Sequence, residues 1–169
     1  LDRNKNEFNQ LLDAITINVT DFFRNPECFT EIEEKVIPSI LLSKISNKQR
    51  IIRAWSCGCS TGDEVYSLAM LFLDNFGELK DEFILSIIGS DIDKKTLDSA
   101  QNLTYNKKRL NGVREVFIAK YFDKIDNDKY RIKDLVKKTV KFREYDIILD
   151  PSYKHCDIIL CRNLLIYFN

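Results

Sequence analysis

A short apolar segment followed directly by small residues is the feature that most constrains the fold. Residues Ile51–Trp55 form a β-prone run, and the segment Cys57–Gly62 contains only cysteine, glycine, serine and threonine. Apolar residues then recur at helical spacing from Val65 to Phe76. The pattern predicts a strand, a tight loop and a helix, which is the unit that builds parallel sheets.

The same alternation continues along the chain. Residues Phe83–Gly89 are almost continuously apolar, as in a strand that is buried on both faces, and a helical stretch Lys94–Gln101 follows. Two later strands are predicted at Thr139–Tyr145 and Cys156–Cys161. The sequence therefore predicts an α/β fold with a mostly parallel sheet and flanking helices.

The N-terminal part has a helical pattern. Apolar residues share one face from Phe8 to Ile15, and a second helical stretch runs from Glu31 to Leu42, where Pro38 is expected to break or bend it. We expect residues 1–48 to be a helical lead-in and residues 49–169 to form the main domain. A polar stretch, Asp123–Lys133, is predicted to separate two sub-regions.

Composition excludes some classes of function. Lysine plus arginine and aspartate plus glutamate both total 26, so no net positive field draws the chain to nucleic acid or to anionic lipid. The sequence has neither an apolar leader nor a run long enough to cross a bilayer, so we expect a cytoplasmic protein without membrane insertion. The five cysteines form no CxxC pair and His155 is the only histidine, so we predict no metal site and assign these residues no catalysis.

Polar residues follow the predicted strands where ligands bind in doubly wound sheets. Gly58 and Gly62 allow a ligand to approach the backbone of the first loop, and the absence of G-x-G-x-x-G favours a nucleoside without a pyrophosphate. A purely structural turn remains the alternative. Glu64 stands in the first turn of the next helix, where it either binds an ammonium group or simply complements the helix dipole.

Two further strand ends carry candidate groups. Asp91 can accept hydrogen bonds from both hydroxyls of a ribose, or it can cap a helix, a role that Asp93 fills equally well. Arg162 and Asn163 place a cation and an amide after the last predicted strand, with helix capping as the alternative. Upstream, the stretch from Asn18 to Arg24 contains two adjacent phenylalanines, which by themselves favour a core role.

Taken together, four motifs resemble the CheR chemotaxis-receptor methyltransferases. In chain order they are Thr16-x-Asn18-x-Thr20-x-Phe22-Phe23-Arg24, Trp55-Ser-x-Gly-Cys-Ser-Thr-Gly-x-Glu64-x-Tyr66-Ser67, Ser90-Asp91-Ile92-Asp93 and Cys161-Arg-Asn-x-x-Ile-Tyr-Phe168. The last is the most specific of the four. The resemblance implies a Rossmann-like class I methyltransferase domain that uses S-adenosyl-L-methionine to methylate glutamate side chains of transmembrane chemoreceptors. The products would be glutamyl methyl esters and S-adenosyl-L-homocysteine, in chemotaxis adaptation.

The resemblance also assigns roles to individual residues. Arg24 and Tyr167 would lie near the transfer site, Asp91 would bind the ribose, and Glu64 would bind the methionyl amine. Asp146 departs from the asparagine that is usual in the family, which leaves its role on the adenosine side open. The cofactor-binding set that the resemblance implies is Asn18, Thr20, Arg24, Glu64, Asp91, Asp146, Ile147, Arg162 and Asn163.

Other expectations concern segments that the family has and partners that it binds. We expect the C-terminal strands of the domain to be missing, which would leave the last strand as an uncovered apolar edge. Residues 121–139 are expected to be a reduced form of an insert that binds a tethering peptide in some members, and because they contain no glycine we expect no tethering here. The methylation helices of chemoreceptors are the expected partners. A catalytically silent cofactor-binding module and a small-molecule methyltransferase remain as alternatives.

Overall fold

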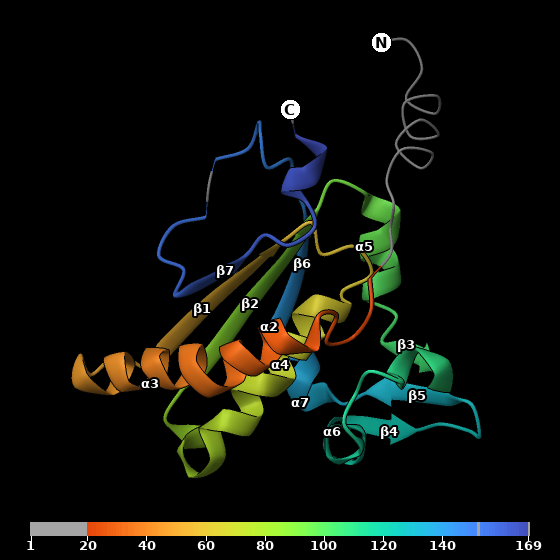
Figure 1. Cartoon of the computed structure of the whole chain (residues 1–169), viewed down its shortest axis with the longest axis horizontal. Coiled ribbons are helices and arrows are strands. Elements are labelled where there is room, and N and C mark those ends of the chain that lie inside the picture. Colours follow the sequence, from red (N-terminus) through yellow and green to blue (C-terminus); the bar gives the residue numbers. More distant parts are fainter. Residues whose placement is uncertain (1–19, 152, 169) are drawn as a thin grey trace.

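A parallel four-stranded sheet forms the centre of the computed structural model, which describes residues 20–151 and 153–168. The strand order is β6-β2-β1-β7, and every neighbouring pair is parallel. The strands are β1 (Ile51–Cys57), β2 (Ile84–Asp91), β6 (Val140–Glu144) and β7 (Ile158–Leu160). All four predicted strands are therefore confirmed, and the α/β fold with them (Figure 1).

The order of the strands reverses once, next to β1. The chain runs outward from β1 to β2 and β6, and it then returns to place β7 on the other side of β1. In such sheets, ligands bind beyond the carboxyl ends of the strands that flank the reversal, and we call this region, beyond the ends of β1 and β7, the crevice. β7 is an edge strand of this sheet, and its Ile159 is half-exposed.

Two helices pack against the sheet. They are α4 (Asp63–Phe76) and α5 (Lys94–Ala100), and both contact β2. The Tyr66 hydroxyl of α4 donates a hydrogen bond to the carbonyl oxygen of Ala100 at the end of α5, 2.9 Å away. Burial along α4 is continuous from Val65 to Phe72, because the helix packs on the sheet, on the N-terminal helices and on α7 (Asp134–Lys137).

The N-terminal helices of the described part form one continuous helical segment, and the predicted helical stretch Phe8–Ile15 lies outside the described residues. The continuous segment consists of α2 (Pro26–Glu31), a π-helical turn (Ile32–Val36) and α3 (Ile37–Ser46). Pro38 stands in the first turn of α3, where the missing amide hydrogen costs little. The amide of Ile37 donates to the carbonyl of Ile32, so the helix widens ahead of the proline instead of ending there.

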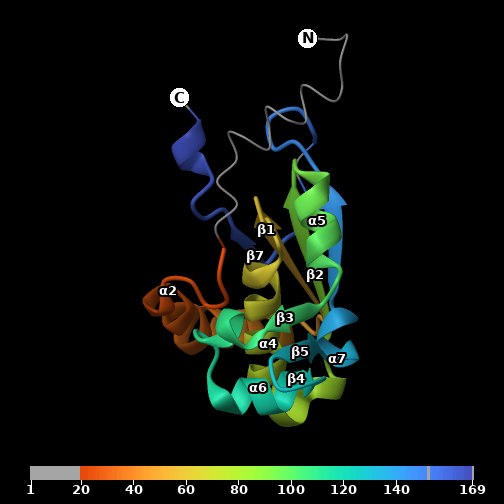
Figure 2. The same cartoon turned by 90° about the vertical axis from the view of Figure 1, so that its right-hand side faces the viewer.

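A second, antiparallel sheet lies beside the main one (Figure 2). Its three strands have the order β3-β5-β4, from Thr104–Asn106, Lys129–Ile132 and Phe122–Lys124 respectively. Four short helices complete this region and the adjoining connection: η2 (Gly77–Asp81), η3 (Lys107–Leu110), α6 (Glu115–Tyr121) and α7 (Asp134–Lys137). The polar stretch Asp123–Lys133 is thus more than a linker, because it forms most of β4 and all of β5, and β5 also pairs with β3.

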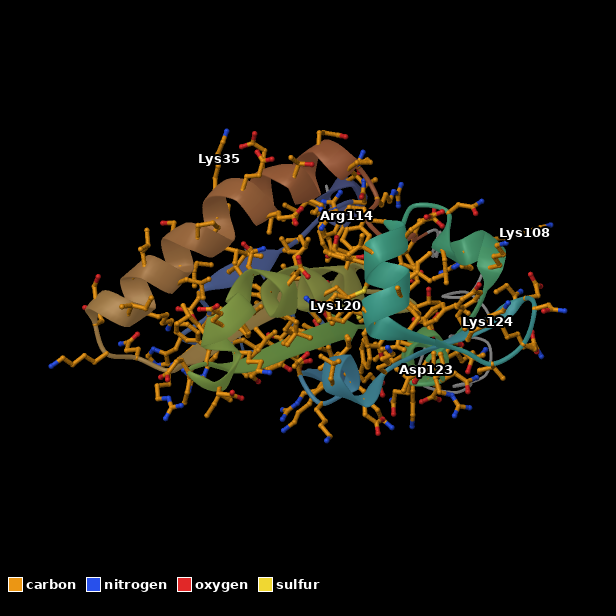
Figure 3. All side chains as sticks on the ribbon, turned by 90° about the horizontal axis from the view of Figure 1, so that it is seen from below. Lys35, Lys108, Arg114, Lys120, Asp123 and Lys124 are labelled. Atoms are coloured by element: carbon orange, nitrogen blue, oxygen red, sulfur yellow. The ribbon has the colours of Figure 1, made fainter. Side chains whose placement is uncertain are left out.

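Ion pairs fix the antiparallel region to the rest of the molecule. Arg114, which precedes α6, lies 2.7 Å from Glu33 of the N-terminal helices, and Lys120 of α6 lies 2.6 Å from Asp74 of α4. Figure 3 shows Arg114 between α6 and the N-terminal helices. Phe22 packs edge-on against Tyr105 of β3, with ring centroids 4.9 Å apart.

None of the helices in the described ranges is both long enough and apolar enough to cross a bilayer.

Candidate functional site

The loop between β1 and α4 is held against the end of β2 by its own backbone. The Cys59 amide donates to the carbonyl oxygen of Ser90 at 2.9 Å, and the Ser60 amide donates to Asp91 Oδ2 at 2.7 Å. Gly58 and Gly62 have φ angles of 67° and 82°, where a side chain would be strained. A Cβ atom on Gly62 would also lie 2.8 Å from the Phe142 ring. The loop therefore needs glycine for both its conformation and its packing.

Asp91 and Asp93 have different roles. Asp91 Oδ1 accepts the Asp93 amide at 3.0 Å, so both Asp91 oxygens organise backbone at the carboxyl end of β2. Asp93 is the N-cap of α5 and accepts hydrogen bonds from the amides of Lys95 and Thr96. The capping role thus belongs to Asp93. Burial raises the pKa of the Asp91 carboxyl, and the backbone hydrogen bonds to it oppose that shift.

Glu64 occupies the first turn of α4 at the mouth of the crevice. Its Oε1 accepts a hydrogen bond from the Ser56 hydroxyl at 2.8 Å, and its Oε2 lies 3.1 Å from Arg162 Nη1. Burial raises the pKa of the Glu64 carboxyl, while the Ser56 hydrogen bond and the positive charge of Arg162 pull it back down. The carboxylate is therefore partly desolvated and already faces a cation.

Arg162 joins three segments that are far apart in the sequence. Besides Glu64, its guanidinium donates from Nη2 to the carbonyl oxygen of Arg24 at 2.6 Å and to Asn25 Oδ1 at 2.9 Å. Its Cζ lies 5.0 Å from the centroid of the Phe29 ring. The end of β7, the start of α4 and the segment before α2 consequently meet at one cation.

The two phenylalanines next to Arg24 belong to the core, as their residue type alone favours. Phe22 and Phe23 are both buried. Phe23 has a φ of 53°, and its amide donates to the Ser67 hydroxyl of α4 at 2.9 Å. This anchoring places the backbone of Arg24 beside the crevice. The side chain of Arg24 also makes the Glu64 carboxylate easier to ionise, through its charge.

Asp146 and Ile147, two further predicted site residues, follow β6 at the same end of the sheet. The amide of Tyr145 donates to the carbonyl oxygen of Asp91, which brings the segment after β6 to the end of β2. Asp146 uses its Oδ1 to accept the amides of Ile148 and Leu149, so its carboxylate stabilises a local turn, and the neighbouring Ile147 is half-buried. Thr20 is half-buried and Asn163 is exposed. Asn18 and the side chain of Tyr167 lie outside the described part.

Several residues of the site received no role of their own from the sequence. Ser56 contacts Glu64, and the Trp55 indole donates to the Ser90 hydroxyl at 2.9 Å. In the sequence, Trp55 indicates only a β-prone segment and Ser56 only a small residue. Asp63 is fully buried and pairs with Arg109, at a sequence distance that no local pattern reveals.

A hollow of about 500 Å³ lies away from these residues, at the amino end of β1. It is lined by Lys44, Gln49, Arg50, Ile51, Arg53, His155, Cys156 and Asp157. It contains none of the predicted cofactor residues, and topology places ligands at the opposite end of such a sheet. Among the described residues, no cluster of histidine, cysteine and acidic side chains is arranged to hold a metal ion.

Comparison with known proteins agrees with this geometry. Residues 18–169 match the family model described as CheR methyltransferase, SAM binding domain. The chain belongs to the CheR methyltransferase family. Because the matching model is that of the S-adenosylmethionine-binding domain, the cofactor of this CheR domain is S-adenosylmethionine.

Individual relatives cover nearly all of this CheR chain. A chemotaxis protein methyltransferase of Borreliella burgdorferi is 31% identical over 95% of the chain, and one of Listeria monocytogenes is 32% identical over 94%. An uncharacterized 104.1 kDa protein of Rhodobacter capsulatus is 30% identical over 99% of the chain, which corresponds to 17% of that protein. The chain spans 57% of the length of the first and second of these relatives.

The donor set of the crevice fits this cofactor chemically. S-adenosylmethionine carries a ribose diol, an ammonium group, a carboxylate and a sulfonium. A partly buried carboxylate at the end of β2 suits the diol, a second one at Glu64 suits the ammonium group, and the arginines suit the carboxylate.

Proposed function

We propose that this chain is the cofactor-binding and catalytic part of a protein-glutamate O-methyltransferase. It would transfer the methyl group of S-adenosylmethionine to glutamate side chains of chemoreceptors and release S-adenosylhomocysteine. The observation that carries the proposal is the meeting of Glu64, Arg162 and the Arg24 segment at the crevice beside β1, in a chain of the CheR family. The names of the relatives supply the chemotaxis context.

The proposed division of labour among the cofactor residues follows from their chemistry. Asp91 accepts hydrogen bonds from the ribose hydroxyls through lone pairs that the Ser60 and Asp93 amides leave free. Glu64 binds the methionyl ammonium group, which then shares its carboxylate with Arg162 or displaces that guanidinium. Arg162, and Arg24 beside it, hold carboxylate groups of the reactants.

The remaining predicted residues complete the pocket in this proposal. The N-terminal segment would contribute Asn18 and Thr20, and the segment after β7 would contribute Asn163. Asp146 and Ile147 lie on the adenosine side, where Asp146 acts through the turn that it stabilises. Tyr167 stands near the transfer site with Arg24.

Methyl transfer to a carboxylate requires the protein to position the reactants and requires no general base. A glutamate carboxylate has an ordinary pKa near 4.3, about three units below neutral pH, and is therefore already a nucleophile. The cofactor supplies an electrophilic methyl group on a sulfonium. Arg24 orients the incoming carboxylate, and such alignment can contribute roughly 7–11 kcal/mol when it is ideal. The partly buried crevice excludes water from the two opposite charges that cancel during transfer.

We place the partner and the compartment in the same proposal. The substrate would be the methylation helices in the cytoplasmic part of transmembrane chemoreceptors, so the chain would act in the cytoplasm. Residues 121–139 would not bind a tethering peptide. The domain that does this work would be residues 49–169, with residues 1–48 as a helical lead-in.

A transfer assay with alkaline release tests this function. The chain is incubated with cofactor labelled in the methyl group and with receptor cytoplasmic fragments, and the product is treated with mild alkali. We expect volatile labelled methanol, because an ester hydrolyses whereas N-methyl and ether products do not. Receptor glutamates changed to glutamine serve as the control. Cofactor binding without transfer would instead indicate a silent binding module, and alkali-stable label would indicate another substrate class.

A further inference from the structure

An ion pair with a fully buried carboxylate stands directly behind the cofactor loop and is not explained by the proposed cofactor contacts. Arg109 Nη2 lies 2.7 Å from Asp63 Oδ1, 2.8 Å from Asp63 Oδ2 and 3.1 Å from Thr61 Oγ1. The Thr61 hydroxyl donates to Asp63 Oδ2 at 2.7 Å. We call Thr61, Asp63 and Arg109 the loop clamp.

The two ends of the loop clamp belong to different parts of the molecule. Thr61 and Asp63 flank Gly62 in the turn from the cofactor loop into α4, whereas Arg109 is on η3, directly after β3 of the antiparallel sheet. The amide of Lys107 at the start of η3 donates to the carbonyl of Asp128, which ties η3 to the β4–β5 turn. The cofactor loop is thereby fastened to the antiparallel sheet through one guanidinium.

Because Asp63 is buried, its carboxylate needs hydrogen-bonding and charged partners. The Asp63 side chain is fully buried while that of Arg109 is 39% exposed. A buried carboxylate without a partner is strongly unfavourable, so the turn can keep Asp63 inside only while Thr61 and Arg109 stay in place. Burial raises the pKa of the Asp63 carboxyl, and Thr61 and Arg109 counter that shift.

The turn that the loop clamp holds is also the turn that presents the site. Glu64 is the next residue along α4, and the Ser67 hydroxyl, which receives the Phe23 amide, donates to the backbone carbonyl of Asp63. The Ser60 amide, two residues before Gly62, donates to Asp91. A shift of Asp63 therefore displaces the start of α4 and the loop backbone together.

We propose that Arg109 and Asp63 are positioning residues for the cofactor, which couple the antiparallel sheet to the cofactor loop without touching the ligand. The proposal rests on the proposed function for its ligand, but its structural consequence does not. Loss of the guanidinium loosens the turn between Ser60 and Glu64, and affinity for the cofactor falls because the bound geometry is no longer held in advance.

Arg109→Gln and Arg109→Lys test this, with Arg114→Gln as the matched control. Arg114 makes an ion pair of similar length with Glu33 nearby, away from the cofactor loop. S-adenosylhomocysteine affinity is measured by calorimetry, and amide exchange is followed at Cys59, Ser60 and Gly62, with Ile87 of β2 as the reference. We expect Arg109→Gln to weaken binding about tenfold and Arg109→Lys to weaken it less.

Exchange distinguishes positioning from general destabilisation. The proposal expects faster exchange at Cys59, Ser60 and Gly62 in Arg109→Gln, an unchanged rate at Ile87, and wild-type behaviour of Arg114→Gln. Equal acceleration at Ile87, or unchanged affinity and unchanged loop exchange, would overturn it. If the wild-type chain does not bind the ligand, the proposed function fails, and the loop exchange rates still decide whether the clamp holds the turn.

Discussion

The two ends of the parallel sheet contain similar charged groups and differ in what surrounds them. At the carboxyl end, Glu64 and Arg162 pair across the crevice between the extensions of β1 and β7. At the amino end, Lys44 of α3 pairs with Asp157 before β7, 2.8 Å apart, above a hollow that also contains Arg50 and Arg53. Each pair connects a helix to the segment next to β7.

The difference lies in the backbone rather than in the charges. Asp157 Oδ2 accepts a hydrogen bond from the Arg53 amide, and Lys44 donates one to Gln49. The amino-end pair therefore connects α3 to the sheet. At the carboxyl end, strand order reverses, the connecting loop has left-handed glycines, and α4 begins. An ion pair at a sheet end is therefore not by itself the mark of a ligand site, and we propose the carboxyl end as the cofactor site because ligands bind at the carboxyl ends of strands beside a reversal of strand order.

The largest expected effect is at Asp91. Asp91→Ala removes the predicted ribose acceptor and the anchor of the Ser60 amide, so we expect cofactor affinity to fall by about a hundredfold or more, at roughly 1.5–3 kcal/mol for each hydrogen bond to a charge. Asp93→Ala is the control, because it removes the α5 cap and costs about 1 kcal/mol of stability with affinity kept. Calorimetry and thermal unfolding measure both, and equal affinities in the two variants would refute the assignment.

Arg24 should affect transfer more than binding. We expect Arg24→Ala to reduce the single-turnover rate of methyl transfer roughly a hundredfold, because a misplaced carboxylate reacts much more slowly, while cofactor binding is partly retained. Arg53→Ala at the amino end is the matched arginine control and should transfer at the wild-type rate. A variant of Arg24 that transfers normally would remove it from the transfer site.

Disrupting the amino-end pair should affect stability alone. Lys44 and Asp157 have side chains only 10% and 21% exposed, so Asp157→Asn leaves Lys44 poorly compensated and should lower the free energy of unfolding by about 1–3 kcal/mol. Denaturant unfolding gives this value. Cofactor affinity should be unchanged, and a large loss of affinity would show that the two ends of the sheet are not functionally distinct.

Cofactor affinity should decrease with falling pH as the Glu64 carboxyl becomes protonated. The pKa of the Glu64 carboxyl is raised by burial, and only the ionised form attracts the ammonium group, so affinity should be full at neutral pH. It should decline as the pH falls toward that pKa, earlier than an ordinary glutamate would allow. Glu64→Gln should bind more weakly at neutral pH and lose part of this dependence. Identical pH profiles would exclude Glu64 as the group.

The smallest effect concerns Cys57, at the end of β1. Burial raises the pKa of its thiol to about 12, with neighbouring Cys161 and Glu64 adding to the shift. A thiol that stays protonated at neutral pH is a poor nucleophile. We expect Cys57 to resist alkylation in the folded chain and to react after unfolding, as mass spectrometry of labelled peptides would show. Rapid labelling in the folded state would contradict the burial of this strand end.

The central sheet was predictable because its signals are local and strong. The run Ile51–Trp55, the loop Cys57–Gly62 and the helical spacing from Val65 follow one another directly, and β1 and α4 form there. The strand at Phe83–Gly89 was visible for the same reason. A break at Pro38, one of the two outcomes predicted there, does not occur, because the helix continues through a π-helical turn ahead of the proline. No residue type in this stretch indicates such a turn.

The antiparallel sheet and the loop clamp depend on contacts that are distant in sequence. β3 has three residues and pairs with β5 more than twenty residues later, with Tyr105 and Ile132 among its few buried side chains. Asp63 meets Arg109 across 46 residues. The choice between capping and binding at Asp91 was likewise open in the sequence, and the geometry gives the cap to Asp93.

Amide chemical shifts measured during a titration with S-adenosylhomocysteine test the central claim most directly, since they report both ends of the sheet in one experiment. If the carboxyl end is the cofactor site, the resonances of Ser60, Gly62 and Asp91 will shift on binding. Those of Gln49 and Arg53, at the amino end, will stay in place. Shifts confined to the amino end would contradict the account.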